Sequence, residues 1–303
     1  MGRRLEALAA LVRGAPPSAA LRRAHARLRR DEILGATRLA GARLDATDLG
    51  ALLDHGRALG GHRLDDYLLA GDYAEAASWA AQRAQRPAPV TTEDVRVLHR
   101  LALRRTSDAA GAWRTRTLPA RADGTVAPPH WLVPFETETY VGRLALLGDE
   151  PVPLAAALAI ARLVRLAPFA CGNGRVARLV GNLIAMRRGY PPAPLDARAQ
   201  RAYPSTVEAA LAGDPLPLAR LFARALGGAL ERLRDAAEGE AELVPLGRFA
   251  GEGSADRLYK AANRGRLRVV RRAGRLYTTA EWFARYDHPS GRRRRFADIK
   301  KGP

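Results

Sequence analysis

The stretch Ala167-Pro-Phe-Ala-Cys-Gly-Asn-Gly-Arg-Val-Ala-Arg178 lies between two strongly apolar segments and carries most of the information about this chain. Its Gly172-Asn173-Gly174 centre allows a tight turn in which successive backbone N–H groups point into one concavity. At the start of a helix, such a turn favours a bound anion. Arg175 and Arg178 are three residues apart, so both guanidinium groups can reach the same polyphosphate. The residues alone predict a phosphate-binding loop, and a turn that needs glycine only for steric reasons is the alternative.

Outward from this loop, the apolar spacing is that of helices in a mainly α-helical chain. The segment Leu154–Val164 is apolar all round, which predicts a helix in the core. Another buried helix follows at Arg175–Arg188 and ends before Gly189. Thr91 precedes acidic residues and an apolar run, as at a capped helix start. Further helices are expected at 5–12, 19–29, 48–59 with Thr47 as N-cap, 64–69 and 217–236.

Two parts of the chain break the helical pattern. Residues 106–130 are rich in Gly and Pro, with strand-like pieces at 113–118 and 125–127, which favours a β-hairpin or an extended flap. After the acidic stretch 237–243, a short helix is expected at 246–250 and a second from Ser254 to Asn263. A hairpin of 267–270 with 275–278 and a final helix at 279–286 follow.

The formal net charge of +19, from 50 Lys and Arg against 31 Asp and Glu, favours polyanionic partners. Residues 245–303 alone hold 16 basic and 5 acidic residues, a difference of +11 (16 − 5). For the N-terminal part, the arginine-rich composition of a GC-rich bacterial gene is the alternative. Cys171 is the single cysteine, no apolar run reaches about 18 residues, and no secretory signal is visible. A cytoplasmic protein without membrane segments is therefore expected, with nucleoid association open.

The loop resembles the signature of the Fic (Fido) family, His-x-Phe-x-(Asp/Glu)-Gly-Asn-Gly-Arg-x-x-Arg. Six of its eight specified positions match, and the resemblance extends over roughly Thr91 to Leu230. The matching residues are Phe169, Gly172, Asn173, Gly174, Arg175 and Arg178.

This resemblance implies a helical bundle with a small β-hairpin flap that holds a segment of a target protein. It also implies transfer of AMP from ATP to a Ser, Thr or Tyr hydroxyl. In the family the His takes the hydroxyl proton and the acid holds Mg²⁺. The glycine-rich backbone and the two arginines bind the phosphates, so ATP or a related nucleotide is the expected ligand.

Two residues that differ from the family signature stand at positions that carry the reaction. Ala167 stands at the position of the motif His, and Cys171 stands at the position of the acid. Alanine cannot accept a proton, and losing a general base costs a factor of about 10²–10⁴. A thiol is a poor ligand for Mg²⁺, which prefers hard oxygen atoms. We therefore expect a pseudoenzyme that binds nucleotide with little AMP transfer.

Three alternatives to this interpretation remain open: an active transferase with another base, an Ala167 engineered in place of His, and a redox or nucleophilic role for Cys171. His99 and His130 are interpreted as core or surface residues rather than replacement bases. The histidines show no metal-ligand spacing, so no metal site is predicted.

The stretch Arg30–Gly35 resembles the surroundings of the family's self-inhibiting motif, (Ser/Thr)-x-x-x-Glu-(Gly/Asn). Ile33 and Gly35 fit, whereas Arg30 occupies the hydroxyl position and Leu34 the Glu position. Without the acid, no self-inhibition is expected, and an ordinary core helix is the alternative.

The pattern of residues 244–287 resembles a winged helix-turn-helix of the excisionase or MerR type. The resemblance implies a DNA-binding domain, with a basic protein-binding module as the alternative. Arg257, Lys260 and Arg264 would face the major groove, and Arg271, Arg272 and Arg275 would lie on the wing.

Taken together, the sequence predicts a Fic-like nucleotide-binding regulator that binds DNA and is impaired in transfer. The expected division is an N-terminal helical region (1–90), a Fic domain (91–236), a linker (237–243), a winged helix-turn-helix (244–290) and a basic tail (291–303). A target protein at the flap and a homodimer are left open.

Overall fold

The computed structural model of the chain describes residues 2–15, 17–121, 124–238, 244–250, 255–272, 274–279, 282–283 and 286. The chain divides into two compact units. One contains residues 1–15 and 22–234, and the other contains residues 16–21 and 235–303. Each unit is described by itself.

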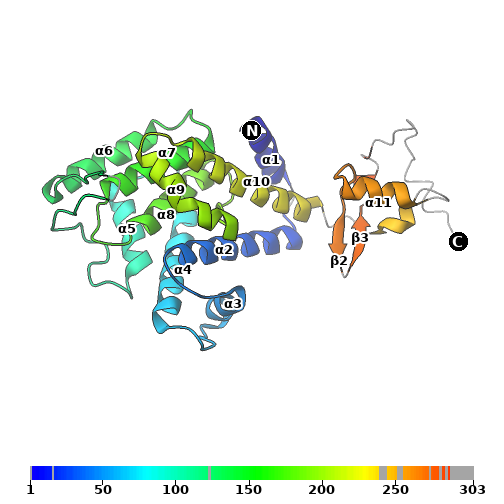
Figure 1. Cartoon of the computed structure of the whole chain (residues 1–303), viewed down its shortest axis with the longest axis horizontal. Helices are drawn as coiled ribbons and strands as arrows, with labels where there is room; N and C mark the ends of the chain where they lie inside the picture. The colour runs from blue at the N-terminus through cyan, green and yellow to red at the C-terminus, as the bar shows by residue number, and fades with distance from the viewer. Residues whose placement is uncertain are drawn as a thin grey trace. The chain divides into compact units, whose positions relative to one another are not determined.

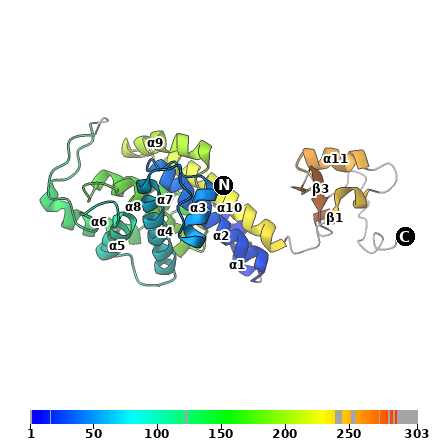
Figure 2. The same cartoon turned by 90° about the horizontal axis from the view of Figure 1, so that it is seen from below.

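The first unit is a bundle of helices (Figures 1 and 2). They are α1 (Gly2–Gly14), α2 (Ala19–Leu39), α3 (Ala46–His55), α4 (Leu64–Ala84), α5 (Thr92–Leu103), η1 (His130–Leu132), α6 (Val133–Ala145), α7 (Val152–Leu166), α8 (Asn173–Arg187), α9 (Ala197–Leu211) and α10 (Leu216–Glu238). The mainly helical fold predicted from the sequence is confirmed. The helix α10 runs two residues into the stretch expected to be a linker.

The centre of this bundle is the pair α7 and α8, with α4 and α5 packed alongside (Figure 1). Most of α7 is buried, as its apolar sequence predicts. Gly181 lets α8 approach α7 closely, because a Cβ there would lie 2.8 Å from Cδ1 of Ile160. The two helices that flank the signature loop are therefore held together along their length, so the loop between them has fixed ends.

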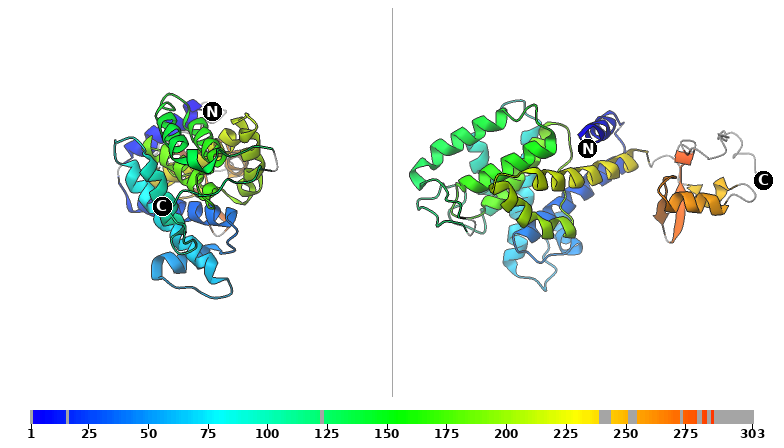
Figure 3. Two further views of the ribbon diagram at one scale, coloured as in Figure 1. Left: turned by 90° about the vertical axis from the view of Figure 1, so that its left-hand side faces the viewer. Right: turned by 45° about the horizontal axis from the view of Figure 1, so that its top comes forward.

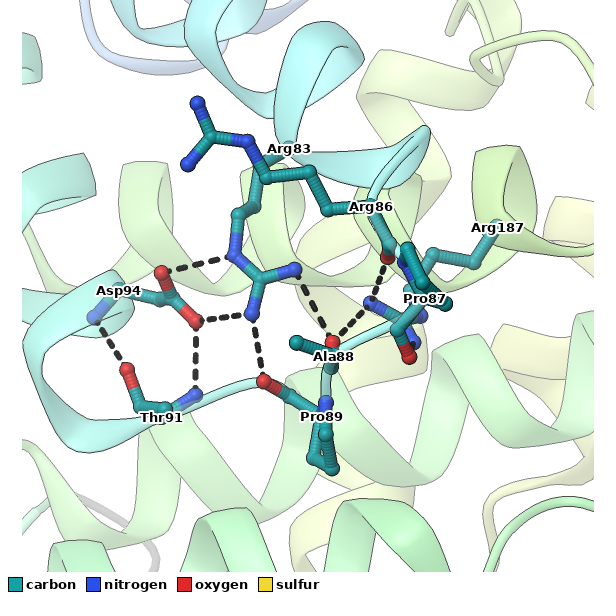
Figure 4. A network of polar contacts seen from close by, with 8 residues as sticks. All are labelled: Arg83, Arg86, Pro87, Ala88, Pro89, Thr91, Asp94 and Arg187. Atoms are coloured by element: carbon teal, nitrogen blue, oxygen red, sulfur yellow. Dashed lines mark hydrogen bonds and ion pairs between the residues drawn. The ribbon is translucent and has the colours of Figure 1, made fainter.

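The start of α5 is tied to α4 and α8 by a network of polar contacts (Figure 4). Thr91 caps α5 in a capping box with Asp94, as predicted. The buried Arg83 donates to both carboxylate oxygens of Asp94, at 2.9 and 2.8 Å, and to the carbonyls of Ala88 and Pro89. Arg187 of α8 donates to carbonyls of the same connection. Two arginines thus fix the loop that leads into α5.

This network gives a pH-dependent prediction. Burial alone would raise the pKa of Asp94, but the contacts with Arg83 and the Thr91 N–H hold it below its ordinary value. A carboxyl with a lowered folded-state pKa stabilises the fold above the ordinary value of about 4, and this is lost as the pH falls through the folded value. We expect Asp94→Asn to lower the unfolding free energy at pH 7 by about 3 kcal/mol. The difference from the wild type should shrink toward pH 3 in urea titrations. Asp108→Asn, at an exposed position, provides the control. A difference in unfolding free energy between Asp94→Asn and the wild type that did not change with pH would contradict this account.

The N-terminal helices differ from the prediction in their limits. The helix α2 continues ten residues beyond Arg29 and so includes the whole stretch Arg30–Gly35. The N-cap of α3 is Asp45 rather than Thr47, because the Asp45 carboxylate accepts the N–H groups of Thr47 and Asp48. The helix α3 ends at His55, since Gly56 takes the left-handed conformation with φ 64°.

The connection between α5 and η1 is an extended flap. Within the part of it that the structure describes, residues 113–118 and 125–127 form no β-strand, so these residues have the extended form that was expected as the alternative. The Arg121 N–H donates to the Thr125 carbonyl at 2.9 Å. Proline at 119, 128 and 129 removes N–H donors that a strand ladder would need.

The second unit contains β1 (Val244–Pro245), η2 (Leu246–Phe249), α11 (Ala255–Asn263), β2 (Val270–Arg272) and β3 (Arg275–Thr278). These elements surround a small apolar core of Leu246, Phe249, Leu258, Ala261, Ala262, Leu267 and Leu276. The strands form an antiparallel sheet in the order β1-β3-β2, and β1 was not predicted.

The hairpin of this unit is shifted from the predicted register. Val270 pairs with Tyr277 and Arg272 pairs with Arg275, so the first strand begins three residues later than Leu267. Leu267 instead joins the apolar core. Of the final helix expected at 279–286, Trp282 and Phe283 are helical; the rest of that prediction, like the turn 251–254 and the tail 291–303, lies largely outside the described residues. The winged helix-turn-helix assignment remains a prediction.

Among the described residues, no helix combines the length and the apolar character that crossing a membrane requires.

Candidate functional site

The signature loop joins α7 to α8 and has a defined backbone. Ala167 ends α7 with φ 43°, the one positive φ of a non-glycine residue in the described parts of the chain. Gly172 begins α8 with φ 73°. Between them, the Asn173 side chain accepts the Phe169 N–H at 3.0 Å and donates to the Phe169 carbonyl at 2.8 Å. Asn173 was predicted as part of a backbone cradle, and its side chain is what closes the loop on itself.

Beneath the loop, Phe169 is fully buried and stacks on the His99 ring, with centroids 3.7 Å apart. The Gly111 N–H donates to Nδ1 of His99 at 2.8 Å, so the proton is on Nε2, which donates to the Cys171 carbonyl at 3.1 Å. Burial lowers the pKa of His99 to about 4. Both ring nitrogens are occupied, so His99 is a structural core residue, consistent with the interpretation from the sequence.

The flap is joined to the loop by the buried Arg114. Its backbone N–H donates to the Pro168 carbonyl at 3.1 Å, and its Nε donates to the Ala167 carbonyl at 2.8 Å. The same guanidinium donates to the carbonyls of Arg116 and Pro128 at the two ends of the flap. Sequence reasoning missed Arg114. The sequence signal was an arginine directly after the apolar Trp113, within the connection between α5 and η1.

Gly172 is required by both conformation and packing. A Cβ at this position would lie 2.7 and 2.8 Å from the two Cδ atoms of the fully buried Leu103. Gly56 has a similar φ of 64°, but a Cβ there would meet nothing within 4 Å. Alanine at Gly56 would therefore have only the free-energy cost of a left-handed backbone, whereas alanine at Gly172 would also have the cost of overpacking.

We expect Gly56→Ala to lower the unfolding free energy by about 1–2 kcal/mol, the cost of a left-handed alanine. Gly172→Ala should lose about 1–3 kcal/mol more because of the overlap with Leu103. Urea unfolding of both variants measures this difference. Equal losses would show that the contact with Leu103 relaxes freely.

Gly174 presents the opposite case. Its φ is not positive, and a Cβ there would meet nothing closer than Nη1 of Arg178 at 3.6 Å. Neither backbone strain nor packing within the described residues explains a glycine in the first turn of α8. Gly174 lies in the first turn of α8, where an anion bound close to the N–H groups would leave no room for a methyl group.

The two signature arginines differ in their surroundings. Arg175 is half-buried and donates to the Ala102 carbonyl at 3.1 Å. Arg178 is buried, lies over the Tyr203 ring and donates to the Ala36 carbonyl of α2 at 3.0 Å. Among the described residues, its Nε has no hydrogen-bond partner. The helix that contains the stretch Arg30–Gly35 therefore lies directly against the second signature arginine.

A buried acid next to Arg178 was not predicted. Glu32 accepts hydrogen bonds from the Tyr73 hydroxyl and the Asn182 side chain, both at 2.8 Å. Burial raises the pKa of Glu32 to about 7, although its hydrogen bonds and the charge of Arg178 lower it. The available signal was an acid four residues after Leu28 and four before Ala36, on the apolar face of α2.

The two departures from the signature occupy different surroundings. Ala167 is buried at 8% exposure, and Cys171 is exposed, with its Sγ 3.9 Å from Oγ of Ser107. Over the described parts of the chain, no group of three or more His, Cys, Asp or Glu residues is close enough to hold a metal ion.

In the second unit, the basic residues singled out in α11 share an exposed face. Arg257, Lys260 and Arg264 are exposed, whereas Leu258, Ala261 and Ala262 on the other face are buried. Lys260 forms an ion pair with Asp256 at 2.7 Å. In the hairpin, Arg271 and Arg275 are exposed, and Arg272 pairs with Arg275 across the turn.

The first unit is thus a helical bundle with a glycine-rich loop at the start of a central helix and a flap beside it. Residues 89–185 match the model of the Fic/DOC family. This chain contains a Fic/DOC family domain, as the signature predicted.

Known proteins agree with this assignment. "Protein adenylyltransferase fic-1" of Caenorhabditis briggsae is 30% identical over 145 residues, which are 47% of this chain and 28% of the relative. The chain therefore spans well under half the length of this relative. A Fic domain containing signaling protein from Bacteroides thetaiotaomicron has a similar structure, with a TM-score of 0.71 and 22% identity over 78% of this chain and 97% of that one. A fragment of Fic-1 from C. elegans has a TM-score of 0.70 and 25% identity over 78% of this chain and 71% of that one.

Proposed function

We propose that this protein binds an adenine nucleotide in its signature loop, transfers AMP poorly, and acts as a DNA-binding regulator. The observation that carries nucleotide binding is the glycine at position 174: its φ is not positive, and a Cβ there would make only an ordinary contact with Nη1 of Arg178 at 3.6 Å, so neither backbone strain nor overpacking requires it. The names of the relatives, protein adenylyltransferases, support ATP as the nucleotide.

The residues present fit the phosphates of a nucleotide. The first turn of α8 offers N–H groups around Gly174, and the half-buried Arg175 follows Gly174 in sequence. Arg178 has an unpaired buried Nε, whose desolvation an anion would offset. An outer phosphate on Arg178 would replace its contact with the Ala36 carbonyl.

The same residues fit the transfer reaction poorly. A target hydroxyl must lose its proton as it attacks the α-phosphorus, and the methyl group of Ala167 cannot take it. The ring nitrogens of His99 are both engaged, so it offers no substitute. Mg²⁺ would neutralise phosphate charge in such a reaction, but Cys171 offers it a thiol where the family has a carboxylate.

Calorimetric titration with ATP and Mg²⁺ tests the binding. The wild type should bind, and Arg175→Ala should bind at least tenfold more weakly, because a charge-assisted contact is lost. Arg143 is exposed on α6, so Arg143→Ala is a matched charge control. An absence of binding to the wild type would remove nucleotide from the proposal.

DNA binding is supported by the exposed basic face of α11 and the exposed arginines of the hairpin. Replacing Arg257 or Arg264 by Ala should weaken DNA binding and reduce the salt slope by about one per lost phosphate contact. A regulator also requires that nucleotide alter DNA binding. DNA affinity unchanged by saturating ATP would end that part of the proposal.

An active transferase is the second candidate, because the relatives are named adenylyltransferases. The flap tied to the loop through Arg114 would then hold the target segment. Incubation of the wild type with labelled ATP and a cell lysate separates the two functions. A labelled protein band would favour the enzyme.

A further inference from the structure

A cavity of about 300 Å³ lies within the first unit, and none of the signature-loop residues 167–178 lines it. Its walls come from α1, α2, α4, α8, the segment after α8, and α10. The helices α1, α2 and α10 are drawn as ribbons in Figure 3, right. They are joined at their surfaces, since Arg232 of α10 forms an ion pair with Asp31 of α2 and Arg4 of α1 forms one with Glu231 of α10, both at 2.8 Å. The volume is at the lower end of the range of about 300–1,000 Å³ that small-molecule sites have.

The walls of this cavity are mainly apolar. Ala77 and Ala81 are four residues apart on α4, and their small side chains leave the volume open. The remaining apolar surface comes from Val12, Leu179, Met186 and Leu233. A ligand that fills this space must therefore have an apolar body.

Two buried polar side chains of the cavity, Asn182 and Glu32, already have partners. Asn182 donates to Glu32 and accepts the Ala193 N–H at 3.0 Å. Glu32 accepts from Asn182 and Tyr73, and it is 4% exposed. A ligand anion placed next to this buried carboxyl would meet an acidic group and no unpaired donor. The buried end thus excludes an anionic group.

The exposed polar groups have the opposite character. Arg13, His25 and Arg29 line the cavity and are exposed, and Glu32 is the only acid among the lining residues. Arg13 donates to the carbonyls of Arg188 and Gly189. Basic side chains are thus concentrated where the cavity meets solvent, next to an apolar interior.

We propose that this cavity binds a small amphipathic carboxylate, with its apolar body between α4 and α8 and its carboxylate at Arg29 and Arg13. The arrangement combines burial of alkyl surface with an exposed charge-assisted contact, which matches the two parts of such a molecule. The site is independent of the nucleotide proposal, because none of the signature-loop residues lines it.

Calorimetric titration of the full chain with hexanoate, octanoate and decanoate tests the proposal. Each added methylene group should tighten binding about two- to fourfold until the cavity is full. Decan-1-ol, which lacks the charge, should bind at least fivefold more weakly than decanoate. Arg29→Ala should weaken decanoate binding by a similar factor, and Arg27→Ala, on the same helix and outside the cavity, should not.

Variants that fill the cavity provide a second test of the proposal. Ala81→Leu should abolish decanoate binding, and Ala77→Val is the milder variant if the first one melts at a lower temperature. Decanoate that bound Ala81→Leu, Ala77→Val or Arg29→Ala as tightly as the wild type would overturn the proposal. No saturable binding by the wild type would overturn it as well.

Discussion

A variant with Ala167→His and Cys171→Asp is expected to transfer AMP about 10²–10⁴ times faster than the wild type, because it regains a general base and a carboxylate for Mg²⁺. The backbone is suited to the change. Ala167 has φ 43°, and His is among the residues that tolerate the left-handed region. Cys171 is exposed, so a carboxylate there remains solvated.

The measurement is label transferred from ATP, labelled in its α-phosphate, to protein in a lysate and to the chain itself. The same double substitution combined with Arg175→Ala is the control, since it restores the base and removes a phosphate contact. Transfer that appears only when Arg175 is present would support the loop as the site. A double variant as inactive as the wild type would show that more than two residues separate this chain from an active transferase.

Gly174→Ala is expected to weaken ATP binding by at least tenfold while leaving the fold as stable as before or more so. A Cβ there contacts no protein atom closer than 3.6 Å, and alanine is favoured over glycine in a helix by about 1 kcal/mol. The methyl group would occupy the space that a phosphate needs beside the helix N-terminus. Loss of binding without loss of stability would separate a ligand role from a structural one.

The matched control for this variant is Gly228→Ala. Gly228 is exposed within α10, and a Cβ there would meet nothing within 4 Å. It should raise the melting temperature slightly and leave ATP affinity unchanged.

Much of the bundle could be predicted because its signals are local. The apolar run of α7, the cap of α5 at Thr91 and the glycine turn before α8 depend on neighbours in sequence. In the flap, residues 113–118 suit a strand, but Pro119 directly follows them and Pro128 and Pro129 directly follow 125–127, so neither piece can be extended into a longer ladder. The hairpin of the second unit shifted because Leu267 is buried in the core instead of joining the strand.

The parts of the site that could not be predicted depend on long-range contacts. Arg178 lies against Ala36, 142 positions away, and Arg114 reaches the Ala167 carbonyl, 53 positions away. Residue spacing placed Arg175 and Arg178 on one helix face, but it could not show that α2 covers the second one. The environment of the buried Glu32 likewise depends on residues far away in sequence, because its hydrogen-bond partners lie on α4 and α8.

Titration of the wild type and Gly174→Ala with ATP and Mg²⁺, side by side with melting curves, tests the central claim most directly. The account predicts saturable binding by the wild type and at least tenfold weaker binding by the variant, at an equal or higher melting temperature. Equal affinity in both proteins would contradict a phosphate site at the start of α8.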